Sequence, residues 1–498
     1  MNRRLLFIAL FLMNILGGWA QVGELPRAIP EDEGVPSEAV TLLFDSLTAL
    51  PKTDIHSVMI LRHGKVIGEI HPAPFAPEYA HTLYSCSKTF VGVAVGLAIA
   101  DNRLRLDDRV ATFFPELLPD SVSDNLASMT VRHLLTMTSG IKPDWGLRSK
   151  TRHWVRAFLS KEVQMPGRDF AYDSLSTYLL SAIVQRATGM TLLDYLKLKI
   201  FHPMHITEVA WEVSPEGYNT GGWGLYLQTE SLAKFGQLLL NRGCWNGQQL
   251  VPAAWLDEMT RCQVKTGRED YGYQTWLCDY PGAVRADGAL GQYIIVVPEK
   301  DMVVVMTEST LTNGRRQRTL VWELLLPNVQ DQPLPVGKAY RKLQKQQPLY
   351  KLPFAEGKAK SSASLRYAGR TIKLSENTLG WKTLRLHFEP KQVVMTVTDA
   401  KGEEYDLHFG YKEWQRATIT AHPPYSIQPI DAFKGIEGLF HVAGSYAWPT
   451  SDTLCLKAHY VDWVSALELR LAGRGADVEV QVIPNYAHRA INIQGELQ

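Results

Sequence analysis

The fold of this chain is organised around the stretch Tyr84-Ser85-Cys86-Ser87-Lys88-Thr89-Phe90 and the apolar residues 91–100 that follow it. Residues 89–100 carry no charge, and small residues recur at every second position from 92 to 100. Such a run is too short to cross a bilayer, so it predicts a helix that is buried in a globular core. In that helix Lys88 lies one turn from the start, on the same face as Ser85.

Ser85 and Lys88 form a candidate catalytic pair. Burial disfavours the charged form of a lysine and pushes the side chain towards a neutral amine. A neutral amine beside a serine hydroxyl at a helix N-terminus is a nucleophile with its base, and the helix dipole favours the alkoxide that develops. The alternative interpretation is that Ser85 only caps the helix and that Lys88 extends to the surface.

The same Ser-x-x-Lys spacing occurs twice more in the chain. The copy formed by Ser139 and Lys142 lies at the end of a predicted helix, where the dipole opposes an alkoxide. The copy formed by Ser231 and Lys234 lies on an amphipathic helix, and we expect its lysine to face solvent. Only the copy at Ser85 combines a helix start with an apolar continuation.

Residues 1–20 have the three regions of a secretory signal peptide: two arginines, an apolar segment and a small residue at the end. We therefore expect an exported protein, periplasmic or secreted, without a stable membrane span; an uncleaved signal anchor is the alternative. Lysine plus arginine (52) and aspartate plus glutamate (51) nearly cancel, which argues against a nucleic-acid partner.

All five cysteines follow the signal peptide, and an odd number in an exported protein leaves at least one thiol free or paired between chains. Cys86 is expected to be free because it lies inside the buried motif. Cys244, Cys262 and Cys278 are close enough in sequence for one bridge, whose pairing the spacing does not decide.

Three regions of different pattern follow the signal peptide. Residues 21–327 have apolar strands near both ends and helices between them, which predicts an antiparallel sheet covered by helices. Residues 328–353 are rich in Pro, Gln and Lys, and we interpret them as a linker. Residues 354–498 alternate apolar and polar residues in short segments, which predicts an all-β domain, barrel- or sandwich-like, without a catalytic cluster. The predicted class is α+β with a small all-β C-terminal domain.

With these residues in view, the chain resembles the serine β-lactamase and penicillin-binding-protein superfamily, in its class C-like branch of esterases, peptidases and transferases. The resemblance spans residues 30–326 and rests on several segments in the order of the family. They are the nucleophile segment 83–90, the segment 131–140, the tyrosine segment 166–174 and the late strand pair 288–299. The resemblance implies a β-lactamase/transpeptidase-like fold, in which an antiparallel sheet is flanked by helices and an all-α part.

The resemblance also implies roles for individual residues. Ser85 is the expected nucleophile, and Lys88 and Tyr172 are the other expected catalytic residues, either of which could be the general base. The backbone N–H groups of Ser85 and Ala289 are expected to hold the oxyanion. The residues expected to bind substrate are Ser174, Asp287, Gly288, Gln292 and Trp276.

The third motif of the family falls at residues 286–288, directly before an apolar hairpin. Asp287 stands there where the family usually has Lys, His or Trp, and Arg285 is the alternative group for a substrate carboxylate. Two literal motif matches, at residues 123–125 and 265–267, lie in a polar loop and in a charged turn, so we assign them no catalytic role.

The predicted function is that of an exported serine hydrolase, which cleaves a small ester or amide through an acyl-enzyme on Ser85. The alternatives are an acyltransferase that uses the same acyl-enzyme, a penicillin-binding peptidase of the cell wall, and a non-catalytic binding protein. We expect a small-molecule ester, amide or peptide as the substrate, and no cofactor. We expect no metal either, because the chain has no His-Glu-x-x-His and a proline interrupts residues 202–205. The sequence leaves the oligomeric state open.

Overall fold

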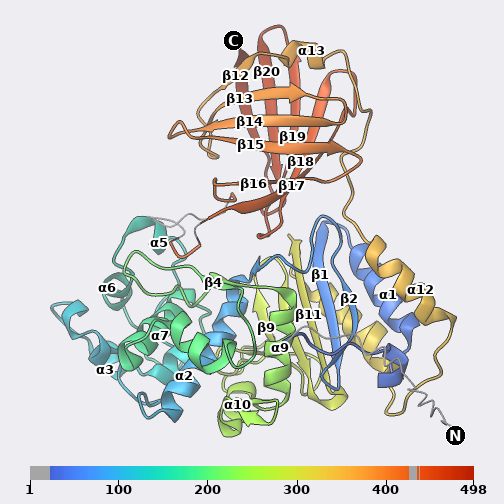
Figure 1. Ribbon diagram of the computed structural model, residues 1–498. Helices are drawn as coiled ribbons and strands as arrows, with labels where there is room; N and C mark the ends of the chain where they lie inside the picture. Colours follow the sequence, from blue (N-terminus) through green and yellow to red (C-terminus); the bar gives the residue numbers. More distant parts are fainter. Residues whose placement is uncertain (1–22, 425–433, 437) are drawn as a thin grey trace, which may run out of the picture.

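The computed structural model describes residues 23–424, 434–436 and 438–498, and it consists of a lower α/β unit and an upper all-β unit (Figure 1). The predicted signal peptide, residues 1–20, lies outside the described residues. The lower unit contains a six-stranded antiparallel sheet with the strand order β2-β1-β11-β10-β9-β8. Its strands are β1 (Thr53–Arg62), β2 (Lys65–Ile70), β8 (Trp276–Leu277), β9 (Val284–Gly288), β10 (Gln292–Val297) and β11 (Met302–Thr310). Early and late strands therefore meet in one sheet, as the sequence predicts.

Helix α1 (Ser37–Thr48) packs on one face of this sheet, and α2 (Ser87–Ala100) and α9 (Thr229–Leu240) pack on the other. A group of helices lies beside the sheet (Figure 1) and consists of α3 (Asp124–Ser128), α4 (Val131–Leu135), α5 (Leu147–Lys150), α6 (Trp154–Leu159), α7 (Ser174–Thr188) and α8 (Leu192–Leu196). The lower unit also contains α10 (Ala253–Thr260) and α11 (Arg315–Leu320). Side chains alternate along each strand, so the two faces enter different hydrophobic cores. In β1, Val58 and Ile60 belong to the core that α1 covers, whereas Met59 and Leu61 belong to the core that contains α2 and α9.

Helix α2 is buried from Ser87 to Ala98, which confirms the predicted core helix. Two of its glycines permit close neighbours. A Cβ atom on Gly96 would lie 2.1 Å from Nε1 of Trp255 in α10, and one on Gly92 would lie 3.0 Å from the carbonyl oxygen of Tyr273. The small residues of this stretch therefore allow α10 and the segment before β8 to pack directly against the α2 backbone.

Short two- and three-residue strands complete the lower unit. They are β3 (His81–Thr82), β4 (Val209–Trp211) and β5 (Leu225–Leu227) in one small sheet, and β6 (Cys244–Trp245) and β7 (Gln248–Gln249) in another. Strand β3 leads directly into the nucleophile segment, so this small sheet fixes the direction from which the chain enters α2.

Ten strands form the upper unit, in the order β15-β14-β13-β12-β21-β20-β19-β18-β17-β16. Residues 409–411 of β15 also pair in parallel with residues 444–446 of β17, so the sheet closes on itself. The predicted all-β domain is confirmed, and its closure makes it a barrel. Its strands are β12 (Thr371–Leu374), β13 (Trp381–Phe388), β14 (Gln392–Asp399), β15 (Glu404–Tyr411), β16 (Gln415–Ile419), β17 (Phe440–Ala447), β18 (Thr453–Tyr460), β19 (Ala466–Arg474), β20 (Asp477–Pro484) and β21 (Ile491–Leu497), and a short helix α13 (Ser364–Tyr367) precedes them.

The segment that the sequence analysis interprets as a linker, residues 328–353, contains helix α12 (Lys338–Gln346). This helix packs against α1, and the side chains of Gln346 and Tyr350 both donate hydrogen bonds to Oδ1 of Asp45. The segment is therefore folded onto the α1 side of the lower unit before the chain enters the barrel (Figure 1).

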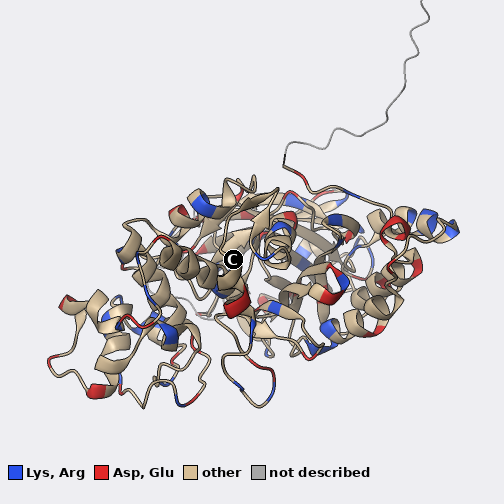
Figure 2. Cartoon of the chain, turned by 90° about the horizontal axis from the view of Figure 1, so that it is seen from below, with Lys and Arg blue, Asp and Glu red and all other residues tan. Residues whose placement is uncertain are grey.

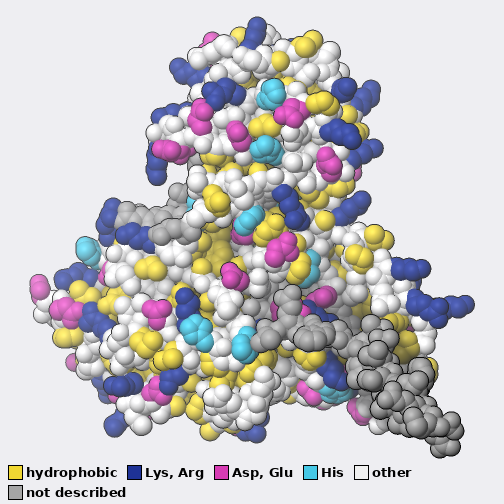
Figure 3. Space-filling view, in the orientation of Figure 1, with side chains coloured by type: hydrophobic (Ala, Val, Ile, Leu, Met, Phe, Trp, Pro, Cys, Tyr) yellow, Lys and Arg dark blue, Asp and Glu magenta, His cyan; other side chains and the backbone are white. Residues whose placement is uncertain are grey.

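Basic and acidic residues are interspersed along the chain, and no large region of one sign stands out in the view from below (Figure 2). Hydrophobic side chains line a hollow between the barrel and the lower unit (Figure 3). Within the described parts of the chain, no helix combines the length and the apolar character that crossing a membrane requires.

Candidate active site

Ser85 lies in a single 3-10 turn, Tyr84–Cys86, directly before helix α2. Tyr84 has a φ of 46°, in the left-handed region, which costs a non-glycine residue about 1–2 kcal/mol. Ser85 is half-buried, whereas every residue from Cys86 to Ala98 is buried. The strained turn thus places one partly accessible hydroxyl at the start of the core helix, where the sequence predicts the nucleophile.

Lys88 is only 1% exposed, and its Nζ lies 2.9 Å from Oγ of Ser85. Nζ also donates to Oγ of Ser174 (2.8 Å) and to the carbonyl oxygen of Gly222 (2.7 Å). Burial lowers the pKa of Lys88 to about 7, although the nearby carboxyl of Asp173 acts in the opposite direction. A lysine with this pKa is partly neutral at neutral pH and can accept the proton of Ser85.

Tyr172 contacts both Ser85 and Lys88. Burial raises the pKa of its phenol, and a hydrogen bond with Ser85 opposes that shift. Nζ of Lys88 lies 4.8 Å from the centre of its ring. The phenol is therefore protonated at neutral pH and suited to donate a proton.

The start of helix α7 holds Lys88 in place. Asp173 caps this helix, because its carboxylate accepts the backbone N–H groups of Leu175 and Ser176, each at 3.1 Å. The cap fixes Ser174, which is 3% exposed and bonded to Lys88. Ser174 was predicted to bind substrate; in the structure its hydroxyl serves Lys88.

The turn between β9 and β10 lies against the nucleophile segment. A Cβ atom on Gly288 would lie 2.3 Å from the carbonyl oxygen of Leu83, so this approach requires glycine. Ala289 follows and is exposed, and Leu290 then has a φ of 62°. This contact brings Ala289, the predicted second oxyanion donor, to the same side of the site as Ser85.

Gln292 needs a corrected role. The sequence analysis assigns it to substrate binding, but its side chain is fully buried. Its Nε2 donates to the carbonyl oxygens of Ala289 (3.2 Å) and Glu308 (2.7 Å). Gln292 therefore supports the turn from inside the core, because a buried amide must satisfy its own hydrogen bonds.

Asp287 and Arg285 are paired with each other. Nε of Arg285 donates to Asp287 at 2.8 Å, and the same guanidinium also pairs with Glu269. Arg285 is only 3% exposed and lies among these carboxylates, so its expected role as a substrate-carboxylate ligand is not supported. Asp287 is partly exposed beside it, and its charge is already partnered.

Aromatic side chains surround the predicted tyrosine. Trp276 is half-buried, and its ring centre lies 5.5 Å from that of Tyr172 and 4.7 Å from that of Tyr271. Phe170 contacts two members of this cluster, Tyr271 and Trp276. Trp276 can therefore form a wall of the substrate space while it holds Tyr172 in position.

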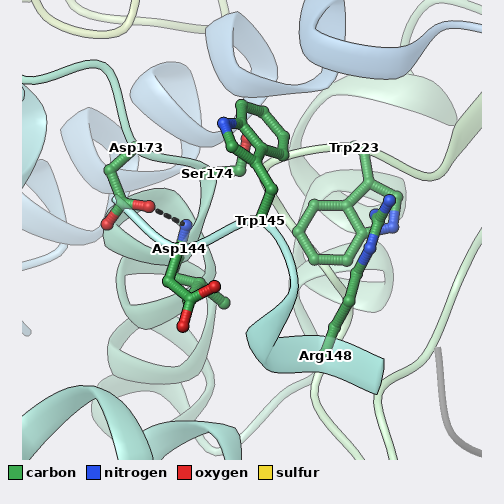
Figure 4. Close-up of a pocket in the computed structure, with 7 residues that line it drawn as sticks. Asp144, Trp145, Arg148, Asp173, Ser174 and Trp223 are labelled. Atoms are coloured by element: carbon green, nitrogen blue, oxygen red, sulfur yellow. Dashed lines mark hydrogen bonds between the residues drawn. The ribbon is translucent and has the colours of Figure 1, made fainter. Parts of the chain in front are cut away.

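A small pocket adjoins the Lys88 side of the site (Figure 4). It is lined by Asp144, Trp145, Arg148, Asp173, Ser174, Leu175 and Trp223. The guanidinium of Arg148 lies 4.9 Å over the ring of Trp223, and Arg148 is 6% exposed. Sequence reasoning missed Arg148 and Gly222, since neither lies in a recognisable motif.

The other two Ser-x-x-Lys copies do not form a comparable pair. Lys142 is exposed, and Oγ of Ser139 accepts the backbone N–H of Ile141. Lys234 was predicted to face solvent, and that prediction is wrong: it is 5% exposed and donates to the carbonyl oxygens of Met204 and His205. These carbonyls allow a buried ammonium to exist without a serine partner.

Metal-ligating side chains and cysteine pairs give no second candidate site in the described part of the chain. Within residues 23–424, 434–436 and 438–498, no group of three or more His, Cys, Asp or Glu side chains is placed to hold a metal ion. All five cysteines are free thiols, so the bridge that the sequence allows among residues 244, 262 and 278 is not formed.

Comparisons with known proteins agree with this geometry. Residues 52–326, more than half of the chain, match the family model described as Beta-lactamase. The 6-aminohexanoate-dimer hydrolase of Paenarthrobacter ureafaciens is 25% identical over 331 residues, which cover 58% of this chain and 84% of that protein. The fold is similar to that of a Bacillus anthracis protein provisionally assigned as a 6-aminohexanoate-dimer hydrolase, with a TM-score of 0.50 and 20% identity over 60% of this chain and 85% of that one. The chain therefore belongs to the Beta-lactamase family and is a serine hydrolase.

Proposed function

We propose that this protein is an exported hydrolase that cleaves a small ester or amide through an acyl-enzyme on Ser85. One observation carries the proposal: Nζ of buried Lys88 lies 2.9 Å from Oγ of Ser85, and burial lowers the pKa of Lys88 to about 7. A nucleophile with an adjacent base of matched pKa is the arrangement that acyl transfer requires.

The first half-reaction forms the acyl-enzyme. Oγ of Ser85 attacks the carbonyl carbon while its proton passes to Lys88. The backbone N–H groups of Ser85 and Ala289 would stabilise the oxyanion, and one such donor typically contributes about 3 kcal/mol. The alcohol or amine then leaves and takes a proton from Lys88, directly or through Tyr172.

The second half-reaction returns the enzyme. Water loses a proton to neutral Lys88 and attacks the acyl carbon, and the carboxylic acid leaves as Ser85 regains its proton. An alcohol or amine in place of water would give acyl transfer, so product analysis with an added alcohol separates the two outcomes.

The substrate class follows from the surroundings of the pair. Arg285 and Asp287 are paired with each other beside the turn, which disfavours the recognition of a β-lactam or peptide carboxylate at this motif. The relative from Paenarthrobacter ureafaciens is named a dimer hydrolase, which supports hydrolysis of a small molecule.

The test is intact mass spectrometry after treatment with a serine-reactive fluorophosphonate. We expect one adduct on the mature protein and none on Ser85→Ala, with a known serine hydrolase as the control for the probe. An adduct on both proteins would assign the nucleophile to another serine. The absence of an adduct on both would reject an activated serine.

Export is a separate part of the proposal, and it rests on the sequence of residues 1–20. We expect the protein in the periplasm or the medium, with an N-terminus that begins at Gln21. N-terminal sequencing of the protein recovered from each fraction tests this, and an intact Met1 in the cytoplasmic fraction would contradict it.

A further inference from the structure

A cavity of about 1350 Å³ opens at one end of the barrel. The turns that join β12 to β13, β14 to β15 and β20 to β21 contribute to its wall, together with residues beside β16 and β17. The aromatic side chains of the wall belong to, or pack against, the barrel core. They are Trp381, Tyr405, Phe440, Tyr460 and Tyr486. The wall also contains the charged side chains of Asp399, Lys401, Glu403 and Arg489. The size of the cavity and its aromatic side chains therefore suit a ligand with an apolar part of substantial length.

This end of the barrel is the one that contacts the lower unit. Nδ2 of Asn485, which lies between two residues of the cavity wall, donates to Oγ of Ser309 in β11 at 2.8 Å. The turn between β18 and β19 contacts the same unit, because the backbone N–H of Thr82 donates to the carbonyl oxygen of Asp462 at 3.2 Å. Trp463 of that turn packs on Tyr226, with ring centres 5.2 Å apart.

These contacts continue to the catalytic residues. Thr310, the neighbour of Ser309, donates its backbone N–H to the carbonyl oxygen of Leu290 at 3.0 Å. Leu290 follows Ala289 and Tyr84 precedes Ser85, and both Leu290 and Tyr84 pack against the hydrophobic core of the barrel. Tyr84, beside the nucleophile, and Leu290, in the turn between β9 and β10, both have left-handed backbones, and the barrel covers both residues.

We propose that the barrel cavity is a subsite of this active site and holds an apolar or aromatic part of the ester or amide substrate. This inference rests on the proposed function of Ser85. Tyr84 and Leu290, which adjoin Ser85 and Ala289, pack against the same barrel core that contributes Trp381, Phe440 and Tyr460 to the cavity wall, so a substrate bound at Ser85 lies beside the barrel end at which the cavity opens. Each buried methylene group should then raise kcat/KM by about fourfold, up to the length that the cavity holds.

The test measures kcat/KM for p-nitrophenyl acetate, butyrate and octanoate, and for ethyl and octyl acetate, so that either side of the ester can reach the barrel. The variants are Ala487→Trp, which fills the cavity, and Ala476→Trp, which adds the same side chain in the exposed turn between β19 and β20. We expect the longer chain to be preferred in at least one series. In Ala487→Trp that preference should fall by about tenfold or more, with the short esters and the melting temperature unchanged. Ala476→Trp should behave like the wild type.

A flat chain-length dependence in both ester series would overturn the inference, provided that the fluorophosphonate still labels Ser85. Loss of labelling would instead overturn the proposed function. Calorimetric titration of octanoate into Ser85→Ala gives an independent readout: binding that Ala487→Trp removes supports the subsite. Octanoate binding combined with flat kinetics would make the cavity a separate ligand site and would also overturn the inference.

Discussion

Two Ser-x-x-Lys pairs of this chain have a buried lysine near the start of a helix, and only one of them is built for chemistry. Lys88 and Lys234 are 1% and 5% exposed, and burial lowers the pKa of both side chains. Nζ of Lys88 contacts Ser85, whereas Nζ of Lys234 donates to two backbone carbonyls at 3.3 Å each. The Ser-x-x-Lys spacing and the burial of the lysine are thus insufficient to make a catalytic pair.

The difference arises from segments that are distant in sequence. Around Lys88, the start of α7 supplies the hydroxyl of Ser174 and the segment after β4 supplies the carbonyl of Gly222. These two acceptors leave the third proton of the ammonium directed at Ser85. Around Lys234 the acceptors come from the chain before β4, and none of the bonds found there is to Ser231.

The largest expected effect separates the two serines. Ser85→Ala should lower kcat by roughly 10⁶-fold, the scale at which a nucleophile is lost, whereas Ser231→Ala should leave kcat within about twofold. Steady-state hydrolysis of p-nitrophenyl acetate measures both. Equal losses of kcat in the two variants would contradict the conclusion that only the pair at Ser85 is catalytic. Circular dichroism of each variant controls for misfolding.

The two lysines should differ by a smaller factor. Lys88→Met should lower kcat/KM by roughly 10²–10⁴-fold, because the general base is lost while Ser85 remains. Lys234→Met makes the same change in charge and shape. Because Lys234 does not contact the active site, the kcat/KM of this variant should stay near the wild-type value. A comparable loss in Lys234→Met would mean that burial of charge, rather than proton transfer, governs activity.

The sequence was sufficient for the features that local pattern controls. The apolar run predicted a buried helix with Ser85 before it, and the alternation after residue 354 predicted the all-β domain. The orientation of Lys234 and Gln292 could not be predicted, because their partners are backbone carbonyls brought together only by the fold. The closure of the barrel over Tyr84 could not be predicted either, because it depends on contacts between segments hundreds of residues apart.

Buried histidines are another set of buried bases in this chain, and they lie where the lower unit meets the barrel. His56 and His81 of the lower unit are bonded through Nδ1 of His56 and Nε2 of His81, 2.9 Å apart. The ring of Phe75 stacks on His56 and contacts His459 of the barrel. Burial lowers the pKa of His81 to about 4 and that of His459 to about 3, the latter with help from Lys457.

These histidines predict a loss of stability in acid. Between the ordinary histidine pKa of about 6.5 and the lowered pKa of the folded state, the unfolded chain binds protons that the folded chain does not. The contribution of these neutral histidines to the free energy of unfolding is therefore fully present above pH 6.5 and decreases as the pH falls towards 4. At pH 5 the free energy of unfolding should be lower by roughly 2 kcal/mol for each such histidine. Urea unfolding at pH 7.5 and 5.0 measures this.

His459→Phe keeps a buried ring without the titrating group, so it should reduce the pH dependence. The substitution of an exposed histidine, His387→Gln, should not change it. An unchanged slope in His459→Phe would show that this base is not responsible for the acid sensitivity.

The smallest effect concerns what holds Lys88 towards Ser85. Since neutral Lys88 is the base, kcat/KM should rise as the pH increases through about 7 and should be lost below it.

Ser174→Ala removes an acceptor from the ammonium of Lys88, which disfavours the charged form of the lysine. The acid limb of the pH profile should therefore move to lower pH, and the plateau of kcat/KM should fall by about tenfold. Ser181→Ala, a buried serine of the same helix that donates to Asn219, should leave the limb in place. A limb that moves to higher pH in Ser174→Ala would contradict the contact with Lys88. A shift to lower pH would show that the hydroxyl of α7, the feature that the neighbourhood of Lys234 lacks, determines which buried lysine of this chain works as a base.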